Sequence, residues 1–548
     1  MTAIGRPAAN DRAVAKSEDG VGRLARSAGL ISIATMASRL LGVAREVVLA
    51  AIFGASAGPA MDAFNVAFRV PNLVRDLFAE GAMTAAFVPT FTRTLNARGR
   101  DAAWRLGNLV INALLVVTGL LVVLGIIFAD PITRAIASGE AFAERPGKLA
   151  LTTELTRIML PFLPTVAVAV AMMGMLNSLH RFFVPALSPA MFNVMTILCA
   201  FTLVPLMPSL GLPPIAAIAM ATVLGGIGQI AVQWPVLRRE GFRYRPTLNF
   251  FDPDVREILR LMGPATLGLA AVQINVVVNT SLATTQPEGA ISWLQAAFRL
   301  MYLPIGLFGV SIATAALPDL SKHAAATDKE AMRRTISSGL RMMLMLNVPA
   351  TIGLIALARP IIEFLLEHGR FSSHDTAGTA AALMFYAPGL VGYSAVKIAS
   401  PSFYSLGDSR TPVIVSVLSV GLNLALNLML VRVMGFRGLA LGTAMAALFN
   451  AGALLVLLRR RLGGLDERRL GIALSKILIA SALMGGVTYL TAGWLETALP
   501  AHGTVVKGIR VFTAIGAGLI VLAGAARLLD ISEFNEAVKK VLQRIGRR

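Results

Sequence analysis

The sequence alternates long apolar stretches with short polar connections, and this pattern predicts a protein built almost entirely from membrane-spanning helices. A helix needs roughly 20 apolar residues to cross about 30 Å of hydrocarbon. About fourteen stretches reach this length, so no large soluble domain is expected. The second and eighth are long and contain charges. The predicted spans cover residues 29–53, 61–92, 103–128, 154–178, 185–206, 214–237, 257–281, 288–317, 336–358, 378–403, 411–432, 438–458, 473–495 and 506–528.

Composition agrees with a chain that is solvated by lipid. Hydrophobic residues make up 56% of the 548 positions and charged residues only 15%, whereas soluble domains carry about 25% charged residues. A net charge of +20 would indicate nucleic acid binding in a soluble basic domain. Because no such domain is predicted here, nucleic acid is not an expected partner.

The distribution of Lys and Arg predicts the orientation of the chain. The tails and loops on the side of the N-terminus hold 31 of these residues, and the opposite side holds 9. Cytoplasmic loops of membrane proteins carry the excess of Lys and Arg. We therefore expect both termini in the cytoplasm, with basic tails at residues 1–28 and 529–548.

An internal repeat predicts two homologous halves. Three short motifs recur in order with offsets of 230, 229 and 227 residues: Ala67–Arg69 and Ala297–Arg299, Val88–Pro89 and Leu317–Pro318, and Asn177–Leu179 and Tyr404–Leu406. The halves form an N-lobe of six spans over 29–237 and a pseudo-symmetric C-lobe of six spans over 257–458. Transporters build a midplane site between such halves. The last two spans, over 473–528, have no counterpart in the repeat.

No motif indicates catalysis, metal binding or nucleotide hydrolysis. The single cysteine, Cys199, lies in an apolar run and is expected to fill space in the core. No HExxH, CxxC or Walker sequence occurs. We therefore expect a protein that is not an enzyme and needs no cofactor. Four asparagines within spans favour helix–helix hydrogen bonding over cation coordination: Asn275, Asn279, Asn423 and Asn427.

Charged side chains concentrate in the first, second and eighth spans. Each costs roughly 2.5–3.5 kcal/mol at the centre of a membrane helix, so such residues face a wet cavity or a partner. At about 1.5 Å per residue, Arg45 and Arg69 lie roughly 12 Å below the outer edge and Arg299 roughly 15 Å. The charged residues of these spans include Arg39, Arg45, Glu46, Asp62, Arg69, Arg75, Asp76, Glu80 and Arg299.

Two interpretations of these charges are open. The arginines could pair with the acids and hold helices together, as Asp76 and Glu80 near the cytoplasmic end suggest. Alternatively, the surplus of arginines binds an anionic substrate. Arginine suits phosphate because its planar guanidinium binds two oxygens at once and does not lose its proton. The surplus favours a substrate that carries a diphosphate or carboxylate.

Five stretches within these spans form a specific signature: Ser38–Glu46, Asp62–Phe64, Phe68–Leu73, Phe78–Ala82 and Ala86–Pro89. They resemble the MurJ (MviN) family of lipid II flippases, which belongs to the multidrug/oligosaccharidyl-lipid/polysaccharide exporter superfamily. The resemblance runs from about residue 25 to the C-terminus. It implies a fourteen-helix transporter of the bacterial inner membrane that functions in peptidoglycan biosynthesis.

The resemblance also implies a substrate and site residues. The substrate is lipid II, an undecaprenyl-diphosphate-linked disaccharide-pentapeptide, which would pass from the cytoplasmic to the periplasmic leaflet by alternating access. Spans 473–528 would form a groove for its polyprenyl tail. Phe298 departs from the family pattern, since some relatives carry an acid before Arg299. With the charge pattern, the resemblance assigns substrate binding to Arg39, Arg45, Arg69, Arg75 and Arg299, and gating or charge balance to Ser38, Glu46, Asp62 and Glu80.

Two other functions fit the same sequence. The chain could export another lipid-linked oligosaccharide, or it could be a non-transporting scaffold for cell-wall synthesis. The arginines of the first two spans disfavour the former, and the lack of sizeable soluble loops disfavours the latter. Besides lipid II and membrane lipids, the candidate partners are an inorganic ion and cell-wall synthesis proteins.

Overall fold

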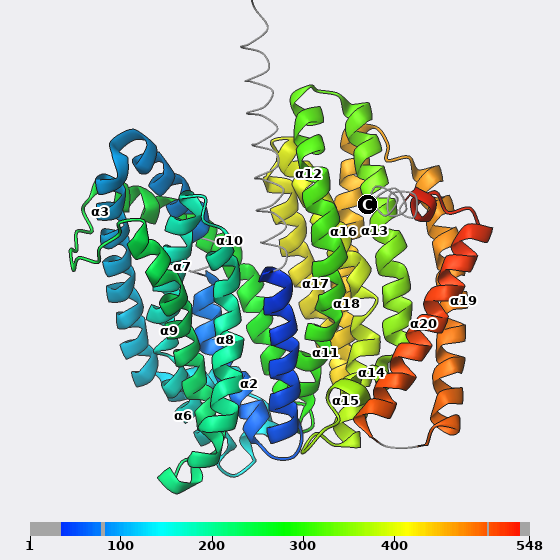
Figure 1. The fold of residues 1–548 in the computed structure, drawn as a ribbon, viewed down its shortest axis with the longest axis horizontal. Coiled ribbons are helices and arrows are strands. Elements are labelled where there is room, and N and C mark those ends of the chain that lie inside the picture. Colours follow the sequence, from blue (N-terminus) through cyan, green and yellow to red (C-terminus); the bar gives the residue numbers. More distant parts are fainter. Residues whose placement is uncertain (1–33, 78–82, 501–502, 537–548) are drawn as a thin grey trace, which may run out of the picture. The chain divides into compact units, whose positions relative to one another are not determined.

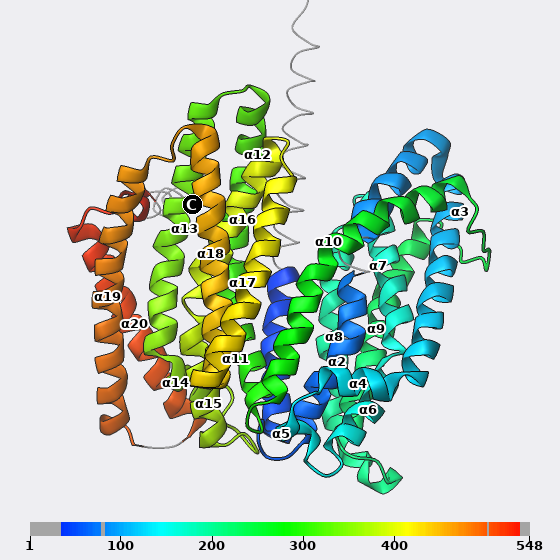
Figure 2. The same ribbon diagram turned by 180° about the vertical axis from the view of Figure 1, so that it is seen from behind.

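A computed structural model describes residues 34–77, 83–500 and 503–536. Helices are the regular elements of these ranges, in which no strand occurs. The first helix covers residues 34–53. The others follow in order from α2 (Ala60–Arg75) to α20 (Thr504–Leu528), as Figures 1 and 2 show. The predicted all-α class is confirmed.

Several of these helices are built to cross a membrane. Within the described ranges nine are long and apolar enough, and the pair α15 (Ser373–Tyr386) and α16 (Gly389–Ser405), bent by 43°, makes a possible tenth. The count of fourteen remains a prediction, since α2 has 16 residues and α11 (Ala290–Pro304) has 15. The nine cover Ala86–Ile127, Lys148–Ser178, Phe183–Leu206, Ala216–Arg239, Lys329–Ala356, Arg410–Met434, Phe436–Leu462, Glu467–Ala498 and Thr504–Leu528.

The described residues divide into two compact units. The first comprises the residues up to Val48, Ala67–Thr133 and Thr152–Ala270, and the second comprises Leu49–Val66, Arg134–Leu151 and the residues from Ala271 onward. Two segments from the first half of the sequence therefore belong to the second unit. The lobe boundaries expected from the repeat stay a prediction.

The first unit has an aromatic and aliphatic core between its helices. Phe87, Phe91 and Trp104 of α3 pack with Phe162 and Met172 of α7, and all five side chains are buried. Helix α3 is kinked at Gly99, whose φ of 83° favours glycine. Besides parts of the first helix and of α2, the helices that contribute to this unit are α3 (Met83–Ile127), α4 (Ala129–Ile136), α6 (Lys148–Met159), α7 (Phe162–Ser178), α8 (Phe183–Thr202), α9 (Ala216–Arg239) and α10 (Pro253–Thr284).

The second unit contains two adjoining cores. One joins α12 (Val310–Ala325), α13 (Lys329–Ala356), α16 and α18 (Phe436–Leu462) through residues such as Leu320, Ile398 and Leu454. The other joins α13 to α19 (Glu467–Ala498) and α20 through Ile477 and Ala526. This unit also contains α5 (Glu140–Ala143), α11, α14 (Ala358–Leu365), α15 and α17 (Arg410–Met434).

The helix bounds carry the same repeat as the sequence. Helices α7 and α16 both have 17 residues, and both of their ends are displaced by 227 positions. Helices α2 and α11 also match, because each passes into π-helical geometry, at residues 76–77 and at Ile305–Gly309. Such π turns are rare and often mark functional positions. The two halves thus break their charged helices at equivalent places.

Candidate functional site

In the first unit, helix α8 positions the arginine of the first helix. The Arg45 guanidinium carbon lies 5.4 Å from the centre of the Phe192 ring, a cation–π contact. Its Nη2 atom also lies 3.5 Å from the Glu46 carboxylate. The side chains of Arg45 and Glu46 keep 12% and 16% exposure. Arg45 is therefore held in place while part of its surface stays accessible.

The residue next to Phe192 completes this attachment. Asn193 donates a hydrogen bond of 3.2 Å from Nδ2 to the backbone carbonyl of Ser38. The same amide stands over Gly42, where an added Cβ would lie 3.6 Å from it. Phe192 also contacts Phe68 of α2, with ring centres 5.9 Å apart. One turn of α8 thus fixes both charged helices of the first unit.

The C-terminal half of α2 carries a different arrangement. Arg75 donates to Asp76 Oδ1 from Nε and Nη2, at 3.1 and 2.8 Å, and Asn72 Nδ2 donates to Asp76 Oδ2 at 3.2 Å. The second carboxylate of this region, Glu80, lies outside the described residues. Arg75 therefore pairs with an acid, as the charge-pairing interpretation expects for Asp76. Arg39 and Arg69 are half-buried in the same unit.

In the second unit, Asp62 binds the N-terminal end of α11. Its carboxylate accepts the backbone N–H of Gly289 at 2.9 Å and that of Ser292 at 3.2 Å. The Ser292 hydroxyl donates to it at 2.7 Å and accepts from Asn65 Nδ2 at 3.0 Å. A carboxylate here satisfies N–H groups that have no partner within the helix and opposes the positive end of its dipole.

A buried lysine completes this arrangement, which we call the Asp62 network. Lys148 Nζ lies 3.4 Å from Asp62 Oδ2 and 3.9 Å from Glu288 Oε1. It also stands 4.3 Å from the centre of the Phe142 ring, and Arg145 pairs with Glu288. The basic partner that the structure gives Asp62 is therefore the lysine that begins α6, whereas the sequence suggested an arginine.

A second buried carboxylate holds the turn between the first helix and α2. Asp375 is fully buried and accepts the backbone N–H groups of Ala55 and Ser56 at 3.3 and 3.0 Å. It also accepts the indole N–H of Trp293 at 2.9 Å and the N–H of Ser372 at 3.1 Å. This carboxylate thus ties the turn to α11 and α15 within the second unit.

Arg299 lies on α11 in the second unit and is half-buried. In the sequence it follows Phe298 directly and precedes the π turn at Ile305–Gly309. The structure therefore divides the expected substrate-binding arginines between the units. Arg39, Arg45, Arg69 and Arg75 belong to the first and Arg299 to the second. Ser38 and Glu46 accompany the first group, and Asp62 accompanies Arg299.

Two lysines in or beside predicted spans were missed by sequence reasoning. Lys397 sits in the middle of α16 with an exposed side chain. Its signal was available, because it is a charge within the span predicted over 378–403. The sequence places Lys148 in a loop between the spans 103–128 and 154–178, and its burial depends on the chain folding back onto α11. Only the tertiary structure supplies that information.

The spanning asparagines form a network between helices. Asn427 donates from Nδ2 to Asn279 Oδ1 at 2.7 Å and to Asn423 Oδ1 at 3.2 Å. Asn279 Nδ2 donates to Asn423 Oδ1 at 3.1 Å. Helix–helix hydrogen bonding is thus confirmed for these three residues, which join α10 to α17.

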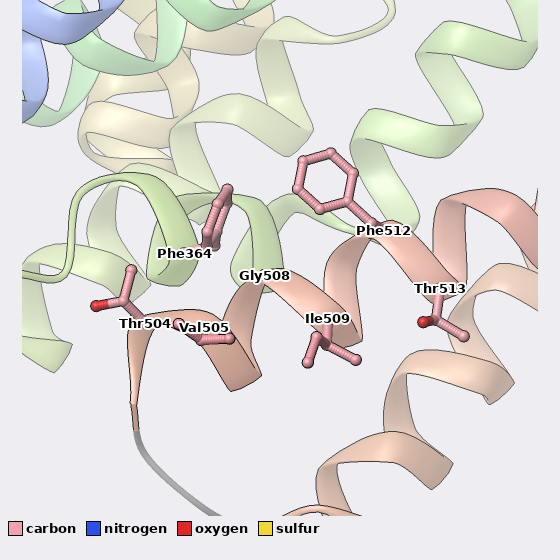
Figure 3. Close-up of a pocket in the computed structure, with 7 residues that line it drawn as sticks. All are labelled: Phe364, Thr504, Val505, Gly508, Ile509, Phe512 and Thr513. Carbon is pink, nitrogen blue, oxygen red and sulfur yellow. The ribbon is translucent and has the colours of Figure 1, made fainter.

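Helix α20 contributes an apolar groove, shown in Figure 3. It encloses about 620 Å³, with Phe364 of α14 on one side and residues of α20 on the other. Beside it, Lys507 pairs with Glu367 at 3.1 Å and with Glu363 at 3.4 Å, which fixes α20 against α14. The α20 residues that line the groove are Thr504, Val505, Gly508, Ile509, Phe512 and Thr513.

Known proteins resemble this chain over most of its length. The family model described as "Lipid II flippase MurJ" matches residues 49–503. A relative from Vibrio cholerae, named "Probable lipid II flippase MurJ", is 33% identical and aligns over 94% of this chain and 98% of its own length. A second, from Rhizobium tropici and with the same name, is 34% identical over 90% of this chain and 91% of its own.

Solved structures agree with this relationship. A structure titled "Lipid II flippase MurJ, inward closed conformation" superimposes with a TM-score of 0.73 at 28% identity, covering 91% of this chain and 99% of the other. A multidrug resistance MATE family transporter of the MOP superfamily has a TM-score of 0.65 at 17% identity, over 78% and 96% of the two chains. At that identity the likeness shows the fold alone. The extent of the family match and the identity to the relatives establish that this multi-pass membrane protein belongs to the MurJ family of lipid II flippases.

Proposed function

We propose that this chain translocates lipid II, the lipid-linked peptidoglycan precursor, from the cytoplasmic to the periplasmic leaflet. The observation that carries the proposal is the family match over 49–503, which includes Arg69, Arg75 and Arg299 and extends over both units. As a flippase the protein is a transporter rather than an enzyme. Lipid II is the substrate named for its relatives.

The arginines of the charged spans would bind the diphosphate of lipid II. Charged side chains in membrane helices are expensive unless a polar space or an opposite charge receives them. Arg45, whose Nη2 atom lies 3.5 Å from the Glu46 carboxylate, keeps 12% of its side chain exposed and so offers an accessible surface for a guest. Arginine binds phosphate oxygens in pairs and stays charged. The proposed ligands are Arg39, Arg45, Arg69, Arg75 and Arg299.

The acidic residues and Ser38 would serve gating and charge balance. Glu46 offsets part of the charge of Arg45. Asp62 holds the start of α11, the helix that carries Arg299. In our proposal, diphosphate binding reduces the repulsion among the arginines and changes the stability of the conformational states, which permits alternating access. Ser38 and Glu80 belong to the same proposed set.

The remaining features follow from this function. We place the protein in the bacterial inner membrane with both termini in the cytoplasm, because of the excess of Lys and Arg on that side. Spans 473–528 would receive the polyprenyl tail, for which the groove of α20 offers an apolar surface. An inorganic ion and cell-wall synthesis proteins are further proposed partners.

Transport by the purified chain in lipid vesicles tests the proposal. Lipid II placed on one leaflet should reach the other at a rate that requires the protein, and the membrane potential and ion gradients are varied separately to identify the energy source. Movement of another lipid-linked oligosaccharide without movement of lipid II would contradict the proposal. The absence of transport of any such lipid would favour a scaffold.

A further inference from the structure

Helix α11 presents a stripe of polar and aromatic side chains around Arg299. Gln295, Arg299 and Tyr302 follow at spacings of four and three residues, so they share one face of the helix. Gln295 and Arg299 are half-buried and Tyr302 keeps 38% exposure. Because an arginine facing lipid is costly, such a stripe belongs to the bundle interior or to a water-filled space.

Four aromatic rings meet beside this stripe and form what we call the aromatic cluster. Phe298 lies at its centre, with ring centres 5.4 Å from both Tyr302 and Tyr386 and 6.2 Å from Tyr393. Tyr302 and Tyr393 are 6.0 Å apart. The rings come from α11, α15 and α16, all within the second unit.

The chemistry of the cluster differs from that of an ordinary core. Three of its four rings carry hydroxyl groups, which can donate and accept hydrogen bonds. The Oε1 atom of Gln295 is buried and accepts no hydrogen bond from the described residues. A buried amide oxygen without a donor is costly, so the site suits a guest that brings N–H or O–H groups.

A saccharide has the two properties that this surface requires. One face of a pyranose ring consists of C–H groups that pack on an aromatic face, and its edge carries hydroxyl and, in amino sugars, amide groups. A polyprenyl tail would use the rings but would leave the Gln295 oxygen without a donor. A diphosphate would use Arg299 but has no need of the rings.

We propose that the aromatic cluster and Gln295 form a saccharide subsite for the headgroup of the transported lipid. This rests on the proposed function, in which Arg299 binds the diphosphate. Tyr302 lies three residues from Arg299, about 4.5 Å along the helix axis. The first sugar of the substrate is bonded directly to the diphosphate, so a sugar subsite must adjoin the phosphate subsite, as Phe298 and Tyr302 adjoin Arg299 on α11.

Binding by the purified full-length chain in nanodiscs tests the subsite. The two probes are undecaprenyl diphosphate and the same lipid carrying the disaccharide without its peptide. The wild-type chain should prefer the disaccharide lipid, and Tyr302→Leu should lower that preference about two- to tenfold. Tyr302→Phe should keep most of it, because the ring remains.

Tyr404→Leu is the matched control, since Tyr404 is an exposed tyrosine of α16 that makes no ring contact within the described residues. It should leave the preference unchanged.

Should Tyr302→Leu not fold, Gln295→Leu decides, because it removes the amide and keeps the rings. If the variant loses affinity equally for both probes, or loses none for either, the subsite is overturned. A wild-type chain that does not prefer the disaccharide lipid would overturn it as well. A chain that keeps the preference but moves no lipid II in vesicles would overturn the transport function and leave the subsite standing.

Discussion

Lys148 Nζ lies 3.4 Å from Asp62 Oδ2, and both side chains are almost completely buried, at 3% and 2% exposure. The carboxylate at the same time accepts two backbone N–H groups at the start of α11. This one ion pair therefore joins the first residue of α6 to the helix that carries Arg299. An ion pair at such depth is sensitive to the loss of either member, because the other is left as an uncompensated buried charge.

Replacing Lys148 by Met should destabilise the protein by about 3–5 kcal/mol, the usual cost of removing one partner of a buried pair. The side chain of Met has a similar length, so packing changes little. Thermal unfolding in detergent measures the effect as a lowered Tm. The double variant Lys148→Met with Asp62→Asn removes both charges and should recover part of the loss. A double variant that is no more stable than Lys148→Met would contradict this account of the pair.

Replacing Asp375 by Asn should loosen the turn between the first helix and α2. The carboxylate accepts hydrogen bonds from Ala55 and Ser56, and an amide can offer only one acceptor oxygen. Hydrogen bonds to a charged group contribute about 1.5–3 kcal/mol each. Hydrogen exchange of the backbone amides of Ala55 and Ser56, followed by mass spectrometry, should become faster.

Asp408→Asn provides the comparison for that experiment. Asp408 also accepts backbone N–H groups, those of Arg410 and Thr411, but at the start of α17. Its hydrogen bonds from Thr411 and the nearby Arg461 guanidinium hold the pKa of its carboxyl below the usual value. Exchange at Ala55 and Ser56 should stay at the wild-type rate in this variant. Equal rates in Asp375→Asn and wild type would refute the role assigned to Asp375.

The sequence predicted the features that depend on local pattern. The all-helical class, the positions of the apolar helices and the repeat all follow from periodicity and from motifs that recur at a fixed offset. The equal lengths of α7 and α16 and the π turns after α2 and α11 are the structural form of that repeat. Even so, α2 has only 16 residues, fewer than the roughly 20 that cross the hydrocarbon of a membrane.

Contacts between residues that are far apart in the chain could not be predicted from the sequence. Lys148 follows an apparent loop, and nothing in its neighbourhood indicates that it lies against Asp62, 86 positions earlier. Asp375 likewise binds a turn that is about 320 positions distant. By contrast, Lys397 could have been found, because a charge in an apolar run is visible in the sequence alone.

Replacing Arg45 or Arg299 by Ala should abolish growth when the variant is the only flippase of a cell, while the amount of protein in the membrane stays normal. The reason is the proposed contact with the diphosphate. Arg45→Lys should retain partial activity, because lysine keeps the charge but cannot bind two oxygens with a planar fork. Complementation and immunoblotting measure both quantities. Arg432→Ala, at the exposed last turn of α17, should grow normally.

Full growth of Arg45→Ala or Arg299→Ala would count decisively against their role in substrate binding. Loss of growth together with loss of the protein from the membrane would show a structural role instead. The comparison between Arg45→Lys and Arg45→Ala separates the charge from the geometry of the guanidinium. If both fail equally, the planar fork rather than the charge carries the function.

The groove of α20 offers a test of where the polyprenyl tail lies. Val505 is 75% exposed and lines the groove, so Val505→Trp should fill the space beside Phe364 without disturbing a core. If the groove holds the tail, this variant should transport lipid II with its full polyprenyl chain more slowly. A short-chain analogue that does not reach the groove should move at the wild-type rate.

Ile520→Trp, at a site of the same helix that is 74% exposed and lies outside the groove, should leave both rates unchanged. Because the two variants add the same side chain to the same helix, equal slowing by both would mean that bulk on α20, and not occupation of the groove, impairs transport.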